Sequence, residues 1–538
     1  RTVILIDDID RLTAAETRQI FQLVKLTAKF PYVVYVLAFD RQAVAKALEE
    51  FGFESGEAYL EKIVQVSFDI PPISEASLTT FVTTSIDEIL KAYEPAHFDL
   101  TRFGNLFHGG FRKLFTSLRD VRRFVNSLEF GLGLIGRELN AVDFIGIEAV
   151  RIFYPSTFEV IRTNKEVFAG HVNRLLEHSG SEKYAAQVNQ LLNPNGELTE
   201  DLKDILIELF PKLTYAYGRN VYGHAWETEW EKTYRISTTR YFEAYFGLVL
   251  AESEISIQEV TTFITTSESQ TRLERILADW TKNGKLKNAI ESLRYRLGEV
   301  PKENLHNVFA ALLTAGELAS DKGAVFAGQI PEYWGVRWAI FDVLEVIPAE
   351  QRVSTVQETF SSSTALKTML NVTSLIEQVK KENAERHVEF RDQDLEEIKA
   401  IVVDRIREFA TNPAALLINP ALPSILSVWK KWGGSAEEVD AFLARAIQSD
   451  DDLVTFIDSF IYQTHSSAGR VVNTKNHLSI RSLSEWMNPD DVIARLDQTE
   501  DHRLSAGKAE VVKVARSELK RFKSKSLTPE QFDDNRFD

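Results

Sequence analysis

The chain has no cysteine among its 538 residues. This absence excludes disulfide bonds, thiolate catalysis and zinc sites built on cysteine, and it fits a reducing compartment. Long apolar runs are also missing, because no run comes near the roughly 18 residues that a membrane-spanning helix requires. We therefore expect a cytoplasmic protein with no membrane segment.

Basic residues are in the minority, with 62 Lys and Arg against 79 Asp and Glu and a net charge of -17. This balance excludes a surface built wholly to wrap a polyanion. Residues 513–525 still form a basic helical pattern, for which a solvated face is a simpler explanation than a nucleic-acid contact. The length exceeds what one hydrophobic core usually organises, so we expect two or three domains.

Strand and helix patterns alternate over the first 70 residues. Apolar β-type runs cover residues 2–6, 33–39 and 63–70. The first run predicts a central parallel strand covered on both faces. Thr13 and Glu16 form a capping box for a helix through about Lys29, and an Ala-rich helix after the second run stops at Gly52. This alternation predicts a parallel sheet with right-handed crossovers.

Charged residues follow the first two strands directly. Ligands of such sheets bind beyond the carboxyl ends of the strands, where Asp7, Asp8, Asp10, Asp40 and Arg41 fall. A strand-end carboxylate holds the magnesium ion of a nucleotide, which suits Asp7. A second acid can activate water, which makes Asp8 the candidate general base, and Arg41 can sense the γ-phosphate. The alternative is ordinary structure, since apolar strands often end in Asp and Asp40 is a good helix N-cap.

Four blocks in the first 130 residues resemble the KAP family of P-loop NTPases, in the STAND and AAA-like branch. They are residues 3–12 (VILIDDIDRL), 31–41 (PYVVYVLAFDR), 59–66 (YLEKIVQV) and 119–126 (RDVRRFVN). The resemblance implies a Walker B strand, binding of ATP and Mg²⁺, and a nucleotide-binding set of Asp7, Asp10, Arg11, Asp40, Arg119 and Arg123. It also implies a role in bacterial defence against phages or plasmids, together with effector proteins.

The phosphate-binding loop of that family is absent from the sequence. Its pattern, G-x-x-x-x-G-K-[ST], belongs before the first strand. Gly284-Lys285 is followed by Leu286, and Gly507-Lys508 by Ala509, so neither pair completes the motif. We expect the Walker A loop to lie upstream of these residues.

Helical patterns dominate after residue 74. We expect a nucleotide-binding core at 1–73, a helical lid at 74–150 with helices near 75–92, 118–135 and 141–153, and a helical sensor or assembly region at 151–538. On the middle lid helix, Arg119, Arg123 and Asn126 share one face. This face is either solvated or, given the resemblance, turned toward nucleotide or a neighbouring subunit.

The region at 151–538 shows no strict repeat and suggests an irregular solenoid-like array. Its aromatic cluster of Tyr241, Phe242, Tyr245 and Phe246 is expected in the core and not on a base-stacking surface.

The sequence therefore predicts an α/β fold that becomes mostly α: part of a P-loop NTPase core, a helical lid and a large helical region. We expect a Mg²⁺-dependent ATPase switch that forms a homo-oligomer and binds protein effectors. One alternative is a non-enzymatic helical scaffold with a decayed nucleotide site, against which the intact Asp7-Asp8 pair argues. The other is an AAA-type loader on nucleic acid, which the overall charge supports only weakly.

Overall fold

The chain divides into two compact units. A computed structural model describes residues 2–27, 29–50, 52, 54–95, 97–170, 180–193, 198–217, 224–320, 331–382, 389–468, 471–499, 505–525 and 528–534. The first unit is Arg1–Thr80 and the second is Phe81–Asp538. The predicted division at 73 and 150 stays a prediction.

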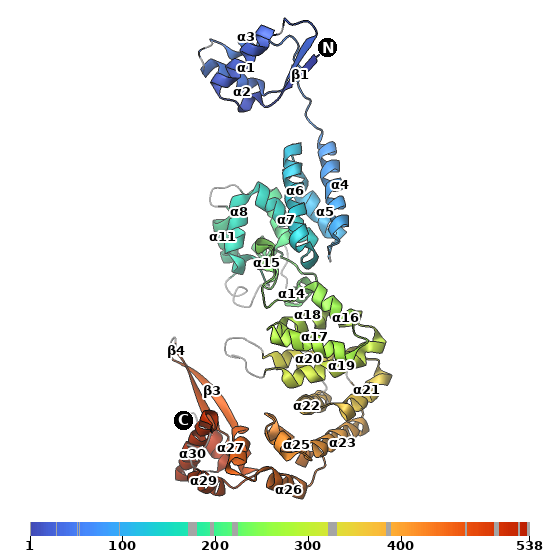
Figure 1. Ribbon diagram of the computed structural model, residues 1–538, viewed down its shortest axis with the longest axis vertical. Coiled ribbons are helices and arrows are strands. Elements are labelled where there is room, and N and C mark those ends of the chain that lie inside the picture. Colours follow the sequence, from blue (N-terminus) through green and yellow to red (C-terminus); the bar gives the residue numbers. More distant parts are fainter. Residues whose placement is uncertain are drawn as a thin grey trace. The chain divides into compact units, whose positions relative to one another are not determined.

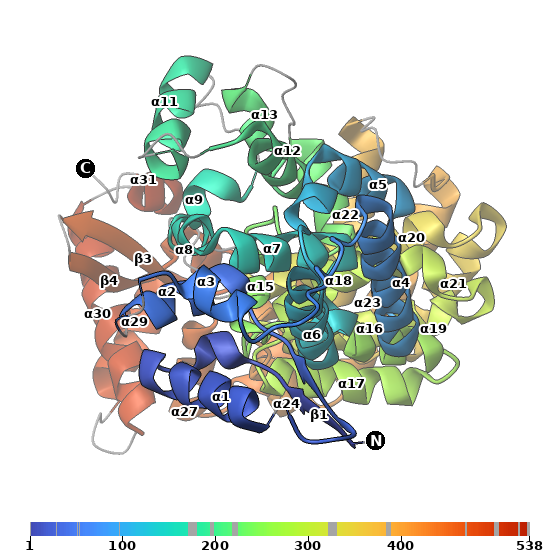
Figure 2. The ribbon, with the colours of Figure 1, turned by 90° about the horizontal axis from the view of Figure 1, so that it is seen from above.

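The first unit is a two-stranded parallel sheet with helices on one side. Its elements are β1 (Thr2–Ile6), η1 (Ile9–Arg11), α1 (Ala14–Thr27), β2 (Val33–Leu37), α2 (Arg41–Glu50) and α3 (Gly56–Glu61). The two strands pair in register from Thr2 opposite Val33 to Ile6 opposite Leu37. In both views α1, α2 and α3 lie on the same side of β1 (Figure 1, Figure 2). The predicted parallel α/β start of the chain is confirmed.

The helix boundaries follow local sequence signals. The Glu16 carboxylate accepts a hydrogen bond from the Thr13 N–H at 3.0 Å, and the Thr13 hydroxyl accepts one from the Glu16 N–H at 3.4 Å. This is the predicted capping box at the start of α1. Beyond the end of α2, Gly52 adopts a left-handed φ of 99°, as glycine readily does at a helix terminus.

One face of this sheet is exposed, contrary to the prediction that both faces are covered. Val3 and Leu5 are 65% and 69% exposed, and Val34 and Val36 are 49% and 46% exposed. The alternate residues pack toward a small core formed by Ile9, Phe21, Val44, Ala45, Leu48 and Leu60. Because side chains alternate along a strand, the helices on one side bury only every second residue.

The third predicted strand, at residues 63–70, is wrong. The structure has no strand there, and Val66, Phe68 and Ile70 are 67%, 88% and 90% exposed. A strand needs a neighbouring strand for its backbone hydrogen bonds and a layer for its side chains. Neither lies beside this segment among the described residues of the unit, so its β-type composition does not become a strand.

The second unit is almost wholly helical. α4 (Glu75–Tyr93) begins in the first unit and continues into the second. The following elements are α5 (Leu100–Gly109), η2 (Phe111–Leu114), α6 (Leu118–Ile135), η3 (Gly136–Glu138), α7 (Ala141–Phe153), α8 (Pro155–Thr163), α9 (Lys165–Phe168), α11 (Ser181–Leu192), α12 (Glu200–Leu209), α13 (Leu213–Ala216), α14 (His224–Lys232), α15 (Phe242–Gly247), α16 (Ile257–Thr265), α17 (Gln270–Lys282), α18 (Leu286–Arg296), η4 (Leu297–Glu299), η5 (Lys302–Asn304), α19 (Leu305–Leu318), α20 (Glu332–Val346), α21 (Ala349–Ser362), α22 (Leu366–Glu382), α23 (Asp392–Phe409), α24 (Pro413–Leu417), α25 (Leu422–Lys431), α26 (Ala436–Ala446), α27 (Asp450–Asp458), β3 (Ile461–Ala468), β4 (Val471–Leu478), α28 (Ile480–Ser484), α29 (Pro489–Gln498), α30 (Ala506–Lys525) and α31 (Pro529–Asp534). The three predicted lid helices correspond to α4, α6 and α7. The mostly helical class is confirmed, but the antiparallel hairpin of β3 and β4 was not predicted.

Between α17 and α23, helices one or two positions apart in the chain pack against each other. α17 packs on α19, α18 on α20, and α21 on α23. One hydrophobic core runs through these helices and on into the C-terminal ones. This neighbour-on-neighbour packing is how an array of helices buries a continuous core. The aromatic cluster before it is also core, as predicted, with Tyr241, Phe242 and Tyr245 at 2%, 1% and 2% exposure.

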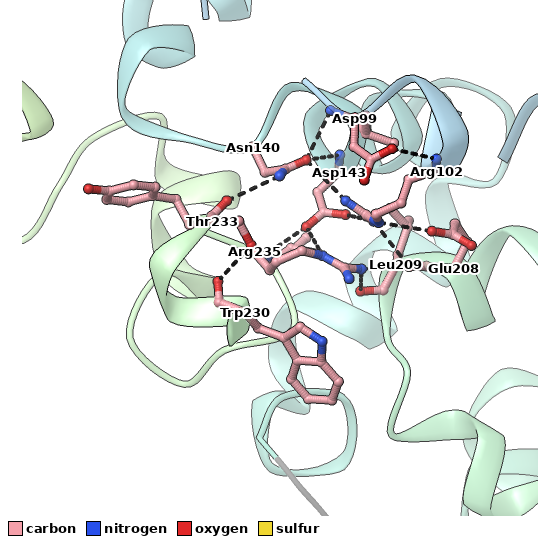
Figure 3. A network of polar contacts seen from close by, with 12 residues as sticks. Asp99, Arg102, Asn140, Asp143, Glu208, Leu209, Trp230, Thr233 and Arg235 are labelled. Atoms are coloured by element: carbon pink, nitrogen blue, oxygen red, sulfur yellow. Dashed lines mark hydrogen bonds and ion pairs between the residues drawn. The ribbon is translucent and has the colours of Figure 1, made fainter. Parts of the chain in front are cut away.

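A buried ionic network fastens α5, α7 and α12 to the segment after α14 (Figure 3). Asp143 lies at its centre with a fully buried side chain. One of its oxygens accepts from Arg102 at 2.5 Å, and the other accepts from Arg235 at 2.9 Å and from the Ile236 N–H at 3.0 Å. Burial acts to raise the pKa of Asp143, but the two arginines outweigh it and hold the pKa below its usual value.

Candidate functional site

The end of β1 carries the acidic residues that the sequence singled out. Asp7 follows the last strand residue, and its carboxylate accepts a hydrogen bond from the Asp8 N–H at 2.8 Å. Asp8 has a left-handed backbone with φ 58° and ψ 31° and stands before η1. Asp tolerates this conformation better than most residues, because its short side chain can bond locally. The tight turn therefore presents two consecutive carboxylates just beyond the strand.

Arg11 and the buried Ile9 fix this turn from its far side. The Arg11 guanidinium lies 3.0 Å from a carboxylate oxygen of Asp8, with the two side chains 64% and 54% exposed. Ile9 is fully buried in the small core, and Asp10 is exposed. One buried residue thus anchors a turn whose charged residues all face solvent.

The end of β2 supplies the second half of the site. Asp40 caps α2, since its carboxylate accepts from the Ala43 N–H at 2.9 Å. Asp40 therefore has the structural role of a helix N-cap. Arg41 begins the helix, and its Nε donates to the Glu57 carboxylate at 2.7 Å.

The parallel register brings these two strand ends to one edge of the sheet. Ile6 pairs with Leu37, and the Ala38 N–H continues the ladder to the Ile6 carbonyl at 2.9 Å. Asp7 and Asp8 therefore leave the sheet at the same edge as Asp40 and Arg41. Such an edge is where ligands of parallel α/β sheets bind.

The donors at this edge suit Mg²⁺, which prefers carboxylate oxygen and is usually held by one or two carboxylates together with substrate phosphates. The described part of the chain contains no group of three or more His, Cys, Asp or Glu side chains arranged to hold a metal ion. Carboxylates at a strand end can serve a metal ion that is bound together with phosphate.

Arg119 and Arg123 belong to α6 in the second unit, and their predicted place in the nucleotide site stays a prediction. Both side chains are exposed, while Val121, Phe124 and Leu128 on the other face of α6 are buried. Arg123 donates to the Ile152 carbonyl at 3.4 Å. The predicted division of α6 into a charged face and an apolar face is confirmed.

Several basic residues of α30, near the C-terminus, pair with neighbouring acids. Lys520 lies 3.2 Å from Asp497, Lys523 lies 3.0 Å from Asp490, and Lys508 is paired with Asp451. These pairs support a solvated, salt-bridged face on α30 over a nucleic-acid contact.

Among the described residues, no helix has both the length and the apolar character of a membrane span.

Sequence reasoning missed two features of these sites. Glu57 partners Arg41 across 16 positions, and the one local signal is its place in the first turn of a helix that Ser55 caps. The network around Asp143 joins residues 41 and 92 positions away. No spacing pattern could have shown it, because its partners meet only after the helices have packed.

Comparison with known proteins bears on the N-terminal quarter of the chain. Phage T7 exclusion protein of Escherichia coli (strain K12) is 37% identical over 70 residues, which are 13% of this chain and 9% of that protein. The chain thus matches less than a tenth of the length of this curated relative. No solved structure matches the chain. The KAP family P-loop domain matches residues 1–131, the region that holds the paired strands, both strand ends and most of α6. Residues 1–131 are therefore assigned to the KAP family P-loop domain.

Proposed function

We propose that the protein is an ATP-binding and ATP-hydrolysing switch of the KAP type. One observation carries this proposal: the register of β1 and β2 places the Asp7-Asp8 turn and Arg41 at one edge of a parallel sheet. The match to a P-loop domain supports the same conclusion. Phosphate binding also requires a Walker A loop, a motif that residues 1–538 do not contain.

The residues at the edge take distinct roles. Asp7 holds the magnesium ion that accompanies ATP, and when bound this ion neutralises charge on the phosphates. Asp8 accepts a proton from the attacking water. Arg41 stabilises negative charge at the γ-phosphate. Asp10, Arg11 and Asp40 frame the site; Arg11 does so by pairing with Asp8.

Arg119 and Arg123 contribute from the lid in this proposal. They occupy the exposed face of α6, and exposed arginines without carboxylate partners are suited to phosphate. In the part of the chain that the structure describes, neither is in an ion pair with Asp or Glu. They would meet nucleotide or a neighbouring subunit.

The biological role we propose is cytoplasmic defence against phage or plasmids, together with protein effectors. The name of the E. coli relative, an exclusion protein for phage T7, supports this role by similarity over a short region. The helical region would recognise a partner or drive self-assembly, since large helical arrays offer extended binding surfaces.

ATP hydrolysis by the full-length protein tests the enzymatic part. Wild-type protein should release phosphate from ATP in the presence of Mg²⁺. Asp7→Ala should abolish the release and Arg41→Ala should lower kcat more than it weakens nucleotide binding. Phage plating on cells that carry the wild type or Asp7→Ala tests the biological role. If the wild type neither binds nor hydrolyses ATP, the chain is a helical scaffold with a decayed site.

The size of the full-length protein with and without ATP tests the switch. A ligand shifts a conformational equilibrium only if it binds the two states differently. We expect ATP to change the oligomeric state or the retention of proteins encoded beside this one. A strict monomer that retains no partner under either condition would leave a solitary ATPase.

A further inference from the structure

The Arg41 side chain makes its hydrogen bond to the protein through Nε. Its Nε donates to Glu57 Oε2 at 2.7 Å, and the side chain is 42% exposed. Its two terminal Nη groups make no hydrogen bond among the residues that the structure describes. The guanidinium is therefore oriented from behind while its outer edge stays open.

Glu57 is mounted on a tightly packed pair of helices. The Ser55 hydroxyl caps α3 by accepting from the Ala58 N–H at 3.2 Å, and the Gly56 N–H donates to Glu49 on α2 at 3.1 Å. A Cβ on Gly56 would lie 2.0 Å from the Ala45 carbonyl oxygen. Only glycine fits this contact, so the first turn of α3 is fixed against α2 directly beside Glu57.

We infer that Glu57 is a positioning residue that aims the two Nη groups of Arg41 at the γ-phosphate. Two parallel N–H groups on a planar fork match two oxygens of a phosphate, provided the plane is held in the right orientation. A free arginine side chain samples many rotamers, and the contact with Glu57 restricts them before ligand arrives. This inference rests on the proposed ATPase function.

The pair is too exposed to be explained by stability. The Arg41 and Glu57 side chains are 42% and 46% exposed, and ion pairs at such sites contribute little to folding. Glu57 lies in the first turn of α3, whereas Arg41 stands at the strand-end edge. Removing Glu57 should therefore change turnover without unfolding the protein.

The test measures kcat, KM for ATP and thermal unfolding in the full-length protein. Glu57→Ala should lower kcat roughly tenfold with KM and unfolding temperature near those of the wild type. Glu57→Gln should recover most of kcat, because its amide oxygen still accepts from Nε. In the Arg41→Ala background, Glu57→Ala should have no further effect, because the residue acts through Arg41.

Glu50→Ala is the matched control, since Glu50 is an exposed carboxylate at the end of α2. It should behave as the wild type. Wild-type kcat in Glu57→Ala, with Arg41→Ala impaired, would overturn the positioning role and leave the ATPase proposal standing. A rise in kcat would overturn it in favour of a restraining contact. An equal loss in the Arg41→Ala background would show that Glu57 acts independently. A wild-type protein without ATPase activity would overturn both proposals.

Discussion

The chain contains two clusters of carboxylates and arginines that differ in burial. At the end of β1, Asp8 and Arg11 are paired with side chains 54% and 64% exposed. In the second unit, Asp143 and Arg235 are paired with side chains 0% and 7% exposed (Figure 3). The chemistry of the side chains is the same, but their surroundings differ.

The two clusters also differ in their hydrogen bonding. Both oxygens of Asp143 are occupied by donors of the protein itself, from Arg102, Arg235 and the Ile236 backbone. A buried charge is tolerated only with such complete pairing, which leaves no place for a ligand. At the strand end, within the described part of the chain, the Asp7 carboxylate accepts one hydrogen bond, from the Asp8 N–H. The exposed cluster keeps the coordination capacity that an exchangeable ligand needs.

Replacing Asp143 by Asn is expected to have the largest effect. It tests directly whether the buried cluster has a structural role. The change would leave two buried arginines facing an uncharged amide, and loss of one partner of a buried pair costs about 3–5 kcal/mol. Chemical denaturation of the full-length protein measures this as a loss in the free energy of unfolding of the helical unit. A loss below about 1 kcal/mol would mean that the network is not a structural fastening.

Asp8→Asn is expected to lower activity and to leave stability unchanged, whereas Asp143→Asn is expected to lower stability. If Asp8 activates water, turnover falls about 10²-fold, or roughly 2.7 kcal/mol in activation free energy. ATP binding and the unfolding temperature should stay near those of the wild type, because Asp8 is exposed and Asn also tolerates its left-handed backbone. Asp69→Asn, at an exposed carboxylate of the same unit, is the control. Wild-type turnover in Asp8→Asn would remove the base assignment.

The exposed strand-end residues and the buried Asp143 network also differ in how far the sequence could predict them. The strand-end residues were predictable, because each directly follows an apolar run and the parallel register does the rest. The lid helices were predictable from their apolar period and caps, such as Ser117 before α6. The strand at 63–70 was predicted wrongly, since its composition favours β structure but no neighbour receives it. The Asp143 network was not predictable, because a lone Asp in an apolar helix does not reveal which distant arginines will surround it.

Glu231 is a half-buried carboxylate that makes no direct arginine contact among the described residues, and it tests whether such a group behaves differently from Asp143. Burial, reinforced by Glu291, raises the pKa of Glu231 to about 7, although a hydrogen bond from the Tyr295 hydroxyl at 3.1 Å and the charge of Arg240 oppose this. The folded state therefore holds a proton that the unfolded state releases near pH 4.5. The contribution of Glu231 to the free energy of unfolding should therefore fall as pH rises from about 4.5 to 7 and then level off.

Glu231→Gln should remove that slope and raise the free energy of unfolding at pH 8 by about 2 kcal/mol. Gln mimics the protonated acid and still accepts from Tyr295. The measurement is the difference in unfolding free energy between variant and wild type at pH 5 and pH 8, which cancels groups common to both. An equal difference at the two pH values would show that Glu231 titrates normally.

The smallest expected effect comes from two ion pairs that join the same part of the fold at different depths. Lys113 in η2 pairs with Asp201 on α12 at 2.7 Å, with side chains 53% and 37% exposed. Arg102 on α5 pairs with Glu208, also on α12, at 3.0 Å, with side chains 16% and 21% exposed. Solvent screens the first pair, so a double-mutant cycle of Lys113→Ala and Asp201→Ala should give a coupling of under about 1 kcal/mol that 1 M salt removes. The same cycle at Arg102 and Glu208 should give a larger coupling that resists salt, because water and ions reach that pair poorly. Equal coupling energies for the two pairs, or equal sensitivity to salt, would contradict the relation between the burial of an ion pair and its structural role.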